Sequence, residues 1–128
     1  TRRTGYMLAL SLVLGLLIGN LTLKPLIARV RPYDANPDFV LLIDRLSDYS
    51  FPSGHTLASF EAATVLLLQY RAKAVPALVL ALLIAFSRLY LYVHYPSDVL
   101  AGALLGVAFA CIARAAVRRM TARSRIEL

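Results

Sequence analysis

The two histidines of this sequence each stand beside other side chains that can take part in chemistry. His55 ends the run Pro-Ser-Gly-His at residues 52–55, and His94 stands four residues before Asp98. At that spacing at the start of a helix, Asp98 can accept a hydrogen bond from one ring nitrogen of His94. The other nitrogen is then free to act as a nucleophile. His55, on a different segment, could act as the general acid that protonates a leaving oxygen.

A set of cations and a helix start form the second part of the candidate site. The cations are Lys24, Arg31 and Arg88. An arginine offers a planar fork of donors that matches phosphate, and a lysine offers a point charge. Backbone N–H groups in the first turn of a helix have no acceptor within the helix, so those of Ser53, Gly54 and His55 suit phosphate oxygens. These residues predict a binding site for a phosphate group.

Neither a metal ion nor a cofactor is expected to take part. The only metal-style set would be the two histidines with Asp98, and the carboxylate cluster of a two-metal phosphatase is missing. The single cysteine, Cys111, allows neither a disulfide within the chain nor a cysteine-based metal site. The residues therefore favour phosphate chemistry without a metal.

The elements that position these residues are expected to lie in a membrane. Of the 128 residues, 59% are hydrophobic and 16% are charged, with a mean hydropathy of +0.68. Soluble domains average roughly 45–50% apolar and about 25% charged residues. The composition therefore argues against disorder and against an ordinary water-soluble fold. The net charge of +7 does not indicate a nucleic-acid partner, because too few polar residues are present to build a soluble basic face.

Four apolar stretches predict an all-α transmembrane helical bundle. They cover residues 5–23, 56–70, 74–93 and 96–117. The second stretch is short, but its helix can begin at Ser53 and Gly54. The short link at 71–73 makes spans two and three a helical hairpin. Because the spans alternate in direction, the polar clusters at their ends meet at one membrane surface.

The segment 32–52 is predicted to be an extramembrane loop, since it holds three prolines and four aspartates. With both chain ends in the cytoplasm, nine cations lie inside: Arg2, Arg3, Arg71, Lys73, Arg114, Arg118, Arg119, Arg123 and Arg125. Five lie outside, and three of those are the candidate phosphate ligands. The positive-inside rule therefore predicts a multi-pass protein of the cytoplasmic membrane, with the site and loop 32–52 on the extracytoplasmic side.

Two further features allow alternatives. Gly-x-x-x-Gly pairs at residues 15/19 and 102/106 fit close packing inside the bundle or a homodimer interface. Glu61 lies inside span two, where an acid is costly; it either makes an internal packing hydrogen bond or has a proton or headgroup role. Arg29 receives no assignment.

The polar residues also form a three-part pattern. Residues 24–32 read Lys-x6-Arg-Pro, residues 52–55 read Pro-Ser-Gly-His, and residues 87–98 read Ser-Arg-x5-His-x3-Asp. In this order and on helix ends, the pattern resembles the signature of the type 2 phosphatidic acid phosphatase superfamily, the membrane lipid phosphate phosphatases. The resemblance covers about residues 15–110 and is to the compact bacterial type.

This resemblance implies a helical bundle, usually of six helices, that hydrolyses a lipid phosphate without a metal through a phosphohistidine. His94 would be the nucleophile, Asp98 its orienting partner and His55 the acid. Phosphate would be bound by the other matching residues: Lys24, Arg31, Arg88, Ser53 and the Gly54 backbone. The chain starts at Thr1 and has four spans. Residues 1–128 are therefore expected to be a single membrane-embedded phosphatase domain without its one or two leading helices.

The substrate stays open among undecaprenyl diphosphate, phosphatidylglycerophosphate and phosphatidate. Two other function classes are weighed against a lipid phosphatase. Vanadium haloperoxidases share the phosphate-like pocket, but they are soluble and larger. A non-catalytic lipid-binding protein would not need both histidines. The sequence therefore favours hydrolysis of a lipid phosphate or diphosphate.

Overall fold

The computed structural model describes residues 1–123, all of whose regular elements are helices. In chain order they are α1 (Arg2–Leu14), the π-helix η1 (Gly15–Leu23), α2 (Lys24–Ile27), α3 (Pro32–Ala35), α4 (Gly54–Tyr70), the 3-10 helix η2 (Arg71–Ala74), α5 (Val75–Tyr90) and α6 (Pro96–Arg123). The described residues contain no strand, and the predicted all-α class is confirmed.

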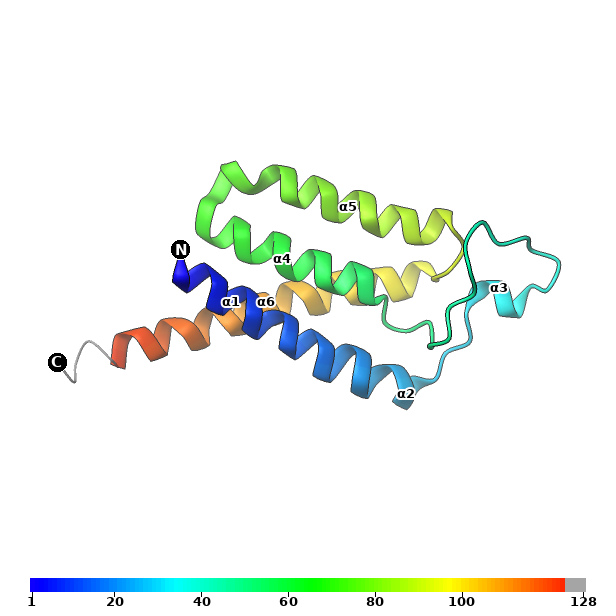
Figure 1. Cartoon of the computed structure of the whole chain (residues 1–128), viewed down its shortest axis with the longest axis horizontal. Coiled ribbons are helices and arrows are strands. Elements are labelled where there is room, and N and C mark those ends of the chain that lie inside the picture. The colour runs from blue at the N-terminus through cyan, green and yellow to red at the C-terminus, as the bar shows by residue number, and fades with distance from the viewer. Residues whose placement is uncertain (124–128) are drawn as a thin grey trace.

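The long helices pack side by side as a bundle (Figure 1). The elements α1, η1 and α2 continue one another, α4 and α5 form an antiparallel hairpin, and α6 is the last helix. Helix α4 is central, because it contacts α1, α5 and α6. Three helical stretches are long and apolar enough to cross a membrane: Arg2–Ala35, Gly54–Tyr90 and Pro96–Arg123. The second of these contains the predicted hairpin, which reverses at η2.

Prolines explain where α3, α5 and α6 begin. Arg31 is extended (φ −72°, ψ 153°), as expected before a proline, and α3 begins at Pro32. Pro76 lies in the first turn of α5 and Pro96 begins α6, where the missing N–H removes no helical hydrogen bond. Helix α6 continues past the predicted end at residue 117, because no glycine or proline interrupts residues 118–123.

Both Gly-x-x-x-Gly pairs pack against α4. A Cβ atom added at Gly102 would lie 2.7 Å from the carbonyl oxygen of Ser53, and one at Gly106 would lie 2.7 Å from that of Leu57. A Cβ atom at Gly15 would lie 2.5 Å from Glu61 Oε1. The glycines therefore allow close helix packing inside the bundle, which was the first of the two interpretations. A homodimer stays a prediction.

The outer surface of the bundle is apolar. Many large side chains of α1, η1, α5 and α6 are exposed, among them Leu17, Leu82, Leu83, Phe86 and Leu104. A helix that is apolar on its outer face is suited to contact lipid chains rather than water. The fold thus gives a continuous apolar surface between two polar ends.

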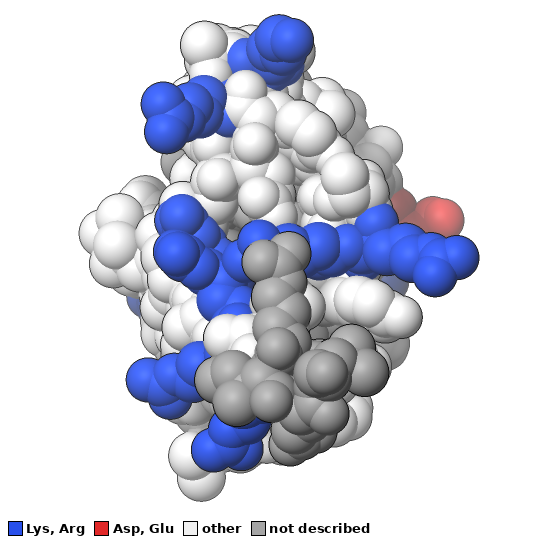
Figure 2. Space-filling model, turned by 90° about the vertical axis from the view of Figure 1, so that its left-hand side faces the viewer, with Lys and Arg blue, Asp and Glu red and all other residues white. Residues whose placement is uncertain are grey.

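The end of the bundle that holds the termini is basic. Figure 2 views this end, where lysine and arginine side chains gather. The exposed cations here are Arg2, Arg3, Arg71, Lys73, Arg118, Arg119 and Arg123. Of the other two predicted inner cations, Arg114 is half-buried and Arg125 lies outside the described residues.

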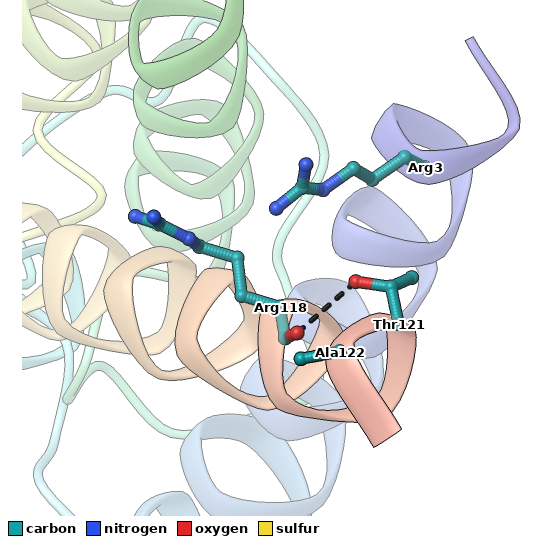
Figure 3. Close-up of a pocket in the computed structure, with 4 residues that line it drawn as sticks. All are labelled: Arg3, Arg118, Thr121 and Ala122. Carbon is teal, nitrogen blue, oxygen red and sulfur yellow. Dashed lines mark hydrogen bonds between the residues drawn. The ribbon is translucent and has the colours of Figure 1, made fainter. Parts of the chain in front are cut away.

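A cavity of about 410 Å³ lies at this basic end (Figure 3). It is lined by Arg3, Arg118, Thr121 and Ala122, and the Thr121 hydroxyl donates to the Arg118 carbonyl at 3.0 Å. Neither histidine lines it. The candidate chemistry is therefore at the opposite end of the bundle.

Candidate active site

Several helix ends lie at the end of the bundle opposite the termini (Figure 1). They are the end of α2, the start of α4, the end of α5 and the start of α6, together with α3 and the loop that follows it. This arrangement places the predicted site residues at one end of the bundle, as the alternation of spans requires.

His94 is buried between Arg31 and Asp98. Its Nε2 lies 3.3 Å from Arg31 Nη1, and its Nδ1 lies 3.6 Å from Asp98 Oδ2. A guanidinium can only donate, so Nε2 accepts, and the proton of the neutral ring belongs on Nδ1, toward the carboxylate. The 3.6 Å separation exceeds hydrogen-bond distance, and Nδ1 has no other partner among the described residues. The orienting role of Asp98 stays a prediction.

Asp98 is fully buried and is held by other donors. Arg29 Nη1 donates to Oδ1 at 2.7 Å, the Tyr95 N–H donates to Oδ2 at 2.8 Å, and the Ser50 hydroxyl donates to Oδ2. The Arg29 guanidinium also lies 4.0 Å from the centre of the Tyr95 ring and bonds to Ser97 Oγ at 2.6 Å. Asp98 thus joins the start of α6 to two segments that are distant in sequence.

Replacing Arg29 with alanine is expected to lower the free energy of unfolding by about 1–3 kcal/mol, because the buried Asp98 carboxylate loses a charged donor. Thermal or denaturant unfolding in detergent measures this change. Arg45→Ala is the matched control, since Arg45 forms an exposed ion pair with Asp34. Such pairs contribute less than about 1 kcal/mol. Equal losses in the two variants would contradict the structural role of Arg29.

Two of the predicted phosphate ligands, Lys24 and Arg31, share one carboxylate. Lys24 Nζ pairs with Asp48 Oδ2, and Arg31 Nη2 donates to Asp48 Oδ1 at 2.6 Å. Arg31 also donates to the carbonyl oxygens of Asp48 and Val93, both at 2.9 Å. Lys24 and Arg31 are 7% and 2% exposed. The two cations therefore form a buried site that already holds an anionic group.

Asp48 is the anion at this site. Burial by itself would raise the pKa of its carboxyl, but the hydrogen bonds and positive charges of Lys24 and Arg31 outweigh that effect and hold the pKa below its usual range. Asp48 is therefore ionised at neutral pH.

An open pocket of about 340 Å³ adjoins the Asp48 carboxylate. It is lined by Asn20, Lys24, Asp48, Gly54, His55 and Ala58. His55 is exposed and can reach a ligand in this pocket. Arg88 does not line this pocket, and its Nε donates to Ser87 Oγ at 3.2 Å. His55, Lys24 and Asp48 thus border one cavity, and Arg31 contacts Asp48 from outside its lining.

The start of α4 offers fewer donors than the sequence predicts. The Ser53 N–H already donates to the Asp98 carbonyl at 3.1 Å, so the expectation that it is a free donor is wrong. The Ser53 hydroxyl is buried and shares a hydrogen bond with Thr56 Oγ1 at 3.0 Å. Of the three predicted donors, the N–H groups of Gly54 and His55 therefore stay available.

Glu61 is not among the residues that contact the two histidines or the cations, and no metal site is found near them in the described residues. Glu61 is buried, and its Oε1 has no hydrogen-bond partner among the described residues. Within residues 1–123, no group of three or more histidine, cysteine, aspartate or glutamate side chains is arranged to hold a metal ion. Metal-independent chemistry stays a prediction, since it concerns the reaction itself.

Comparison with known proteins identifies the family. A family model described as the PAP2 superfamily matches residues 4–122. The chain belongs to the PAP2 superfamily. This finding confirms the resemblance seen in the three sequence motifs.

Relatives of this PAP2 chain include proteins named as lipid phosphatases. It is 40% identical over 108 residues to an undecaprenyl-diphosphatase of Sulfolobus acidocaldarius, a match that covers 83% of this chain and 52% of that protein. Aquifex aeolicus LpxE has a similar structure, with a TM-score of 0.81 and 32% identity over 88% of this chain and 68% of that one.

A transmembrane PAP2-type phosphatidylglycerolphosphate phosphatase from Bacillus subtilis gives a TM-score of 0.73 and 29% identity, over 90% of this chain and 59% of that one. With the apolar spans, this likeness identifies the present chain as an integral membrane protein. The chain spans about half the length of the curated relatives it matches.

Sequence reasoning missed residues that contact the motif residues of this PAP2 protein: Arg29, Asp48 and Ser50. The only sequence signal for Arg29 is its place inside the first motif, two residues before Arg31. Nothing in the sequence distinguishes Asp48 from the other three aspartates of its loop. Its importance comes from the path of the loop.

Proposed function

We propose that this PAP2 protein hydrolyses a lipid phosphate or diphosphate through a phosphohistidine on His94. The supporting observation is that Lys24 and Arg31 hold an anionic group, and that Arg31 also contacts Nε2 of His94. A phosphoryl group in the place of that carboxylate would meet two buried cations, and attack by His94 would require Nε2 to give up its hydrogen bond from Arg31. This arrangement suits attack on phosphorus.

In the first step, Nε2 of His94 attacks phosphorus and the bond from phosphorus to the leaving oxygen breaks. Protonated His55 gives its proton to that oxygen. The imidazole of His94 becomes positively charged as the N–P bond forms, and Asp98 stabilises that charge. Lys24, Arg31 and Arg88 neutralise the phosphoryl oxygens.

In the second step, neutral His55 removes a proton from a water molecule, and the water oxygen attacks phosphorus. The N–P bond breaks and inorganic phosphate leaves. His94 returns to its neutral form and His55 to its protonated form, so the cycle is balanced in atoms and charge. The same side chain thus acts first as acid and then as base.

An isoprenoid diphosphate such as undecaprenyl diphosphate is the proposed substrate. The 40% identity to the Sulfolobus acidocaldarius undecaprenyl-diphosphatase supports this choice. Relatives named phosphatidylglycerophosphatase B and lipid A 4'-phosphatase, at 39% and 36% identity, make other lipid phosphate monoesters the second candidates.

The test is release of inorganic phosphate from a lipid panel by the purified protein in detergent. Undecaprenyl diphosphate should be cleaved faster than phosphatidylglycerophosphate and phosphatidate, and a chelator should leave the rate unchanged. Phosphatidylglycerol, a phosphodiester, serves as the negative control. No release from any lipid, or a rate that a chelator abolishes and magnesium restores, would contradict the proposal.

The site is proposed to face away from the cytoplasm. Without the three proposed phosphate ligands, its side of the protein keeps only Arg29 and Arg45, whereas the other side has nine cations. In a chain with Cys111 replaced, an Asp38→Cys variant should react with a membrane-impermeant thiol reagent in intact cells, and an Ala72→Cys variant should not. Both positions are exposed in the structure, so the reverse labelling pattern would invert the topology.

A further inference from the structure

Asp48 forms ion pairs with Lys24 and Arg31, but the proposed reaction gives it no role. Its two oxygens are divided between Lys24 and Arg31, the side chains that would hold the phosphoryl group. A carboxylate and a phosphoryl group both present oxygen acceptors to such donors. The two groups therefore compete for the same place.

The position of Asp48 in the fold allows it to leave. It lies between α3 and α4, where residues 36–53 form no helix or strand. Its side chain is 52% exposed, whereas those of its partners Lys24 and Arg31 are 8% and 2% exposed. The carboxylate can therefore swing into solvent without unwinding a helix, while the cations stay in place.

We propose that Asp48 is an internal competitor for the phosphate site and sets which lipids can enter it. In the protein without substrate its carboxylate occupies Lys24 and Arg31, and a substrate must displace it. This inference rests on the proposed function, because it takes the two cations as phosphate ligands.

Displacement depends on the charge of the incoming group. A phosphate monoester or a diphosphate carries more than one negative charge near neutral pH, so it attracts two cations more strongly than a single carboxylate does. A phosphodiester headgroup carries one negative charge, as Asp48 does. Because Asp48 is attached to the chain, it also has a high local concentration. Asp48 therefore excludes phosphodiester lipids more than phosphate monoesters or diphosphates.

The loss of affinity that Asp48 causes depends on the fraction of molecules in which its carboxylate is bound to Lys24 and Arg31. If Asp48 occupies the cations in about nine molecules of ten, a competing ligand binds about tenfold more weakly than it would to the open site. Removal of the Asp48 charge should therefore make such a ligand bind about tenfold more tightly.

The experiment compares inhibition constants of orthovanadate, an anion similar to phosphate, for the purified protein and two variants. Asp48→Asn should lower the inhibition constant about tenfold. Asp44→Asn is the matched control, because it removes the same charge from the same loop. Asp44 is exposed and has no ion pair among the described residues. The inhibition constant of vanadate for Asp44→Asn should stay within about twofold of its value for the unchanged protein.

The second measurement tests whether Asp48 excludes phosphodiester lipids. Phosphatidylglycerol in mixed micelles should inhibit Asp48→Asn at concentrations that leave the unchanged protein and Asp44→Asn fully active. If Asp48 instead serves only to position Lys24 and Arg31, Asp48→Asn will bind vanadate more weakly and its KM will rise. That result, or no change in either measurement, would overturn the inference.

Folding is checked by thermal unfolding of each variant, and Asp48→Ala gives a second replacement in case the asparagine variant is unstable. The two proposals can fail separately. A protein that neither hydrolyses lipid phosphates nor responds to vanadate would refute both. An active, vanadate-sensitive protein in which neither Asp48 variant binds vanadate more tightly would refute only the role of Asp48.

Discussion

Replacing His94 with glutamine is expected to lower kcat by a factor on the order of 10⁴ or more, the scale seen when an enzyme loses its nucleophile. Glutamine keeps a polar side chain but has no nitrogen that can attack phosphorus. Phosphate release from the lipid substrate measures the loss. Rapid quenching in alkali with labelled substrate should trap a phosphorylated chain for the unchanged protein and none for His94→Gln.

His94 is 4% exposed and contacts Arg31, so its replacement must be separated from a folding defect. The melting temperature in detergent and the affinity for vanadate serve this purpose, since the cations remain in the variant. A folded His94→Gln protein that still turns over within tenfold of the original rate would show that His94 is not the nucleophile.

The His55→Ala variant should fail in a different way. A general acid contributes about 10²–10⁴-fold to a rate, so turnover of a lipid phosphate should fall by that factor. The loss should shrink to about tenfold with p-nitrophenyl phosphate, whose leaving group needs little protonation. Because His55 is exposed, the replacement should leave the fold unchanged.

The ratio of the two losses is the decisive measurement for His55. Arg88→Ala is the matched comparison, since a phosphate ligand should matter equally for both substrates. If His55→Ala loses the same factor on the lipid and on the nitrophenyl ester, His55 is not the general acid. The proton would then have to come from another group.

The cluster of Lys24, Arg31 and Asp48 also explains how two buried cations persist without a substrate. Two unpaired cations removed from water would be costly, because a buried charge needs a partner. Asp48 supplies that partner on a loop rather than on a helix. The site is therefore neutralised in part before the substrate arrives and can exchange one anion for another.

Local sequence was enough to specify the long helices and the end of the bundle at which the candidate site residues lie. Apolar runs and their proline boundaries predicted α4, α5 and α6, and the alternation of spans placed the ends of α2 and α5 beside the starts of α4 and α6. These features depend on local propensity and on the thickness of a bilayer, both of which a sequence carries directly. The motifs also made His55 and His94 the candidate catalytic residues, and that assignment stays a proposal.

Some local details differed because helix contacts overrode the sequence pattern. The first span contains the π-helix η1, and its Gly15 and Gly19 pack against Glu61 and Leu57 of α4. Ser53 reads as a helix cap with a free N–H, but that N–H bonds to the carbonyl of Asp98. No periodic pattern reports such pairings, since each joins residues on different helices.

Tertiary contacts alone set the path of residues 36–53 and, with it, the role of Asp48. Four aspartates with similar neighbours precede α4, and only Asp48 reaches the buried cations. Arg29 likewise gains its role from an ion pair with Asp98, 69 positions away. The physical reason is that ion pairs and hydrogen bonds between distant segments fix this loop. Their partners are chosen by three-dimensional proximity, which neither spacing nor hydropathy encodes.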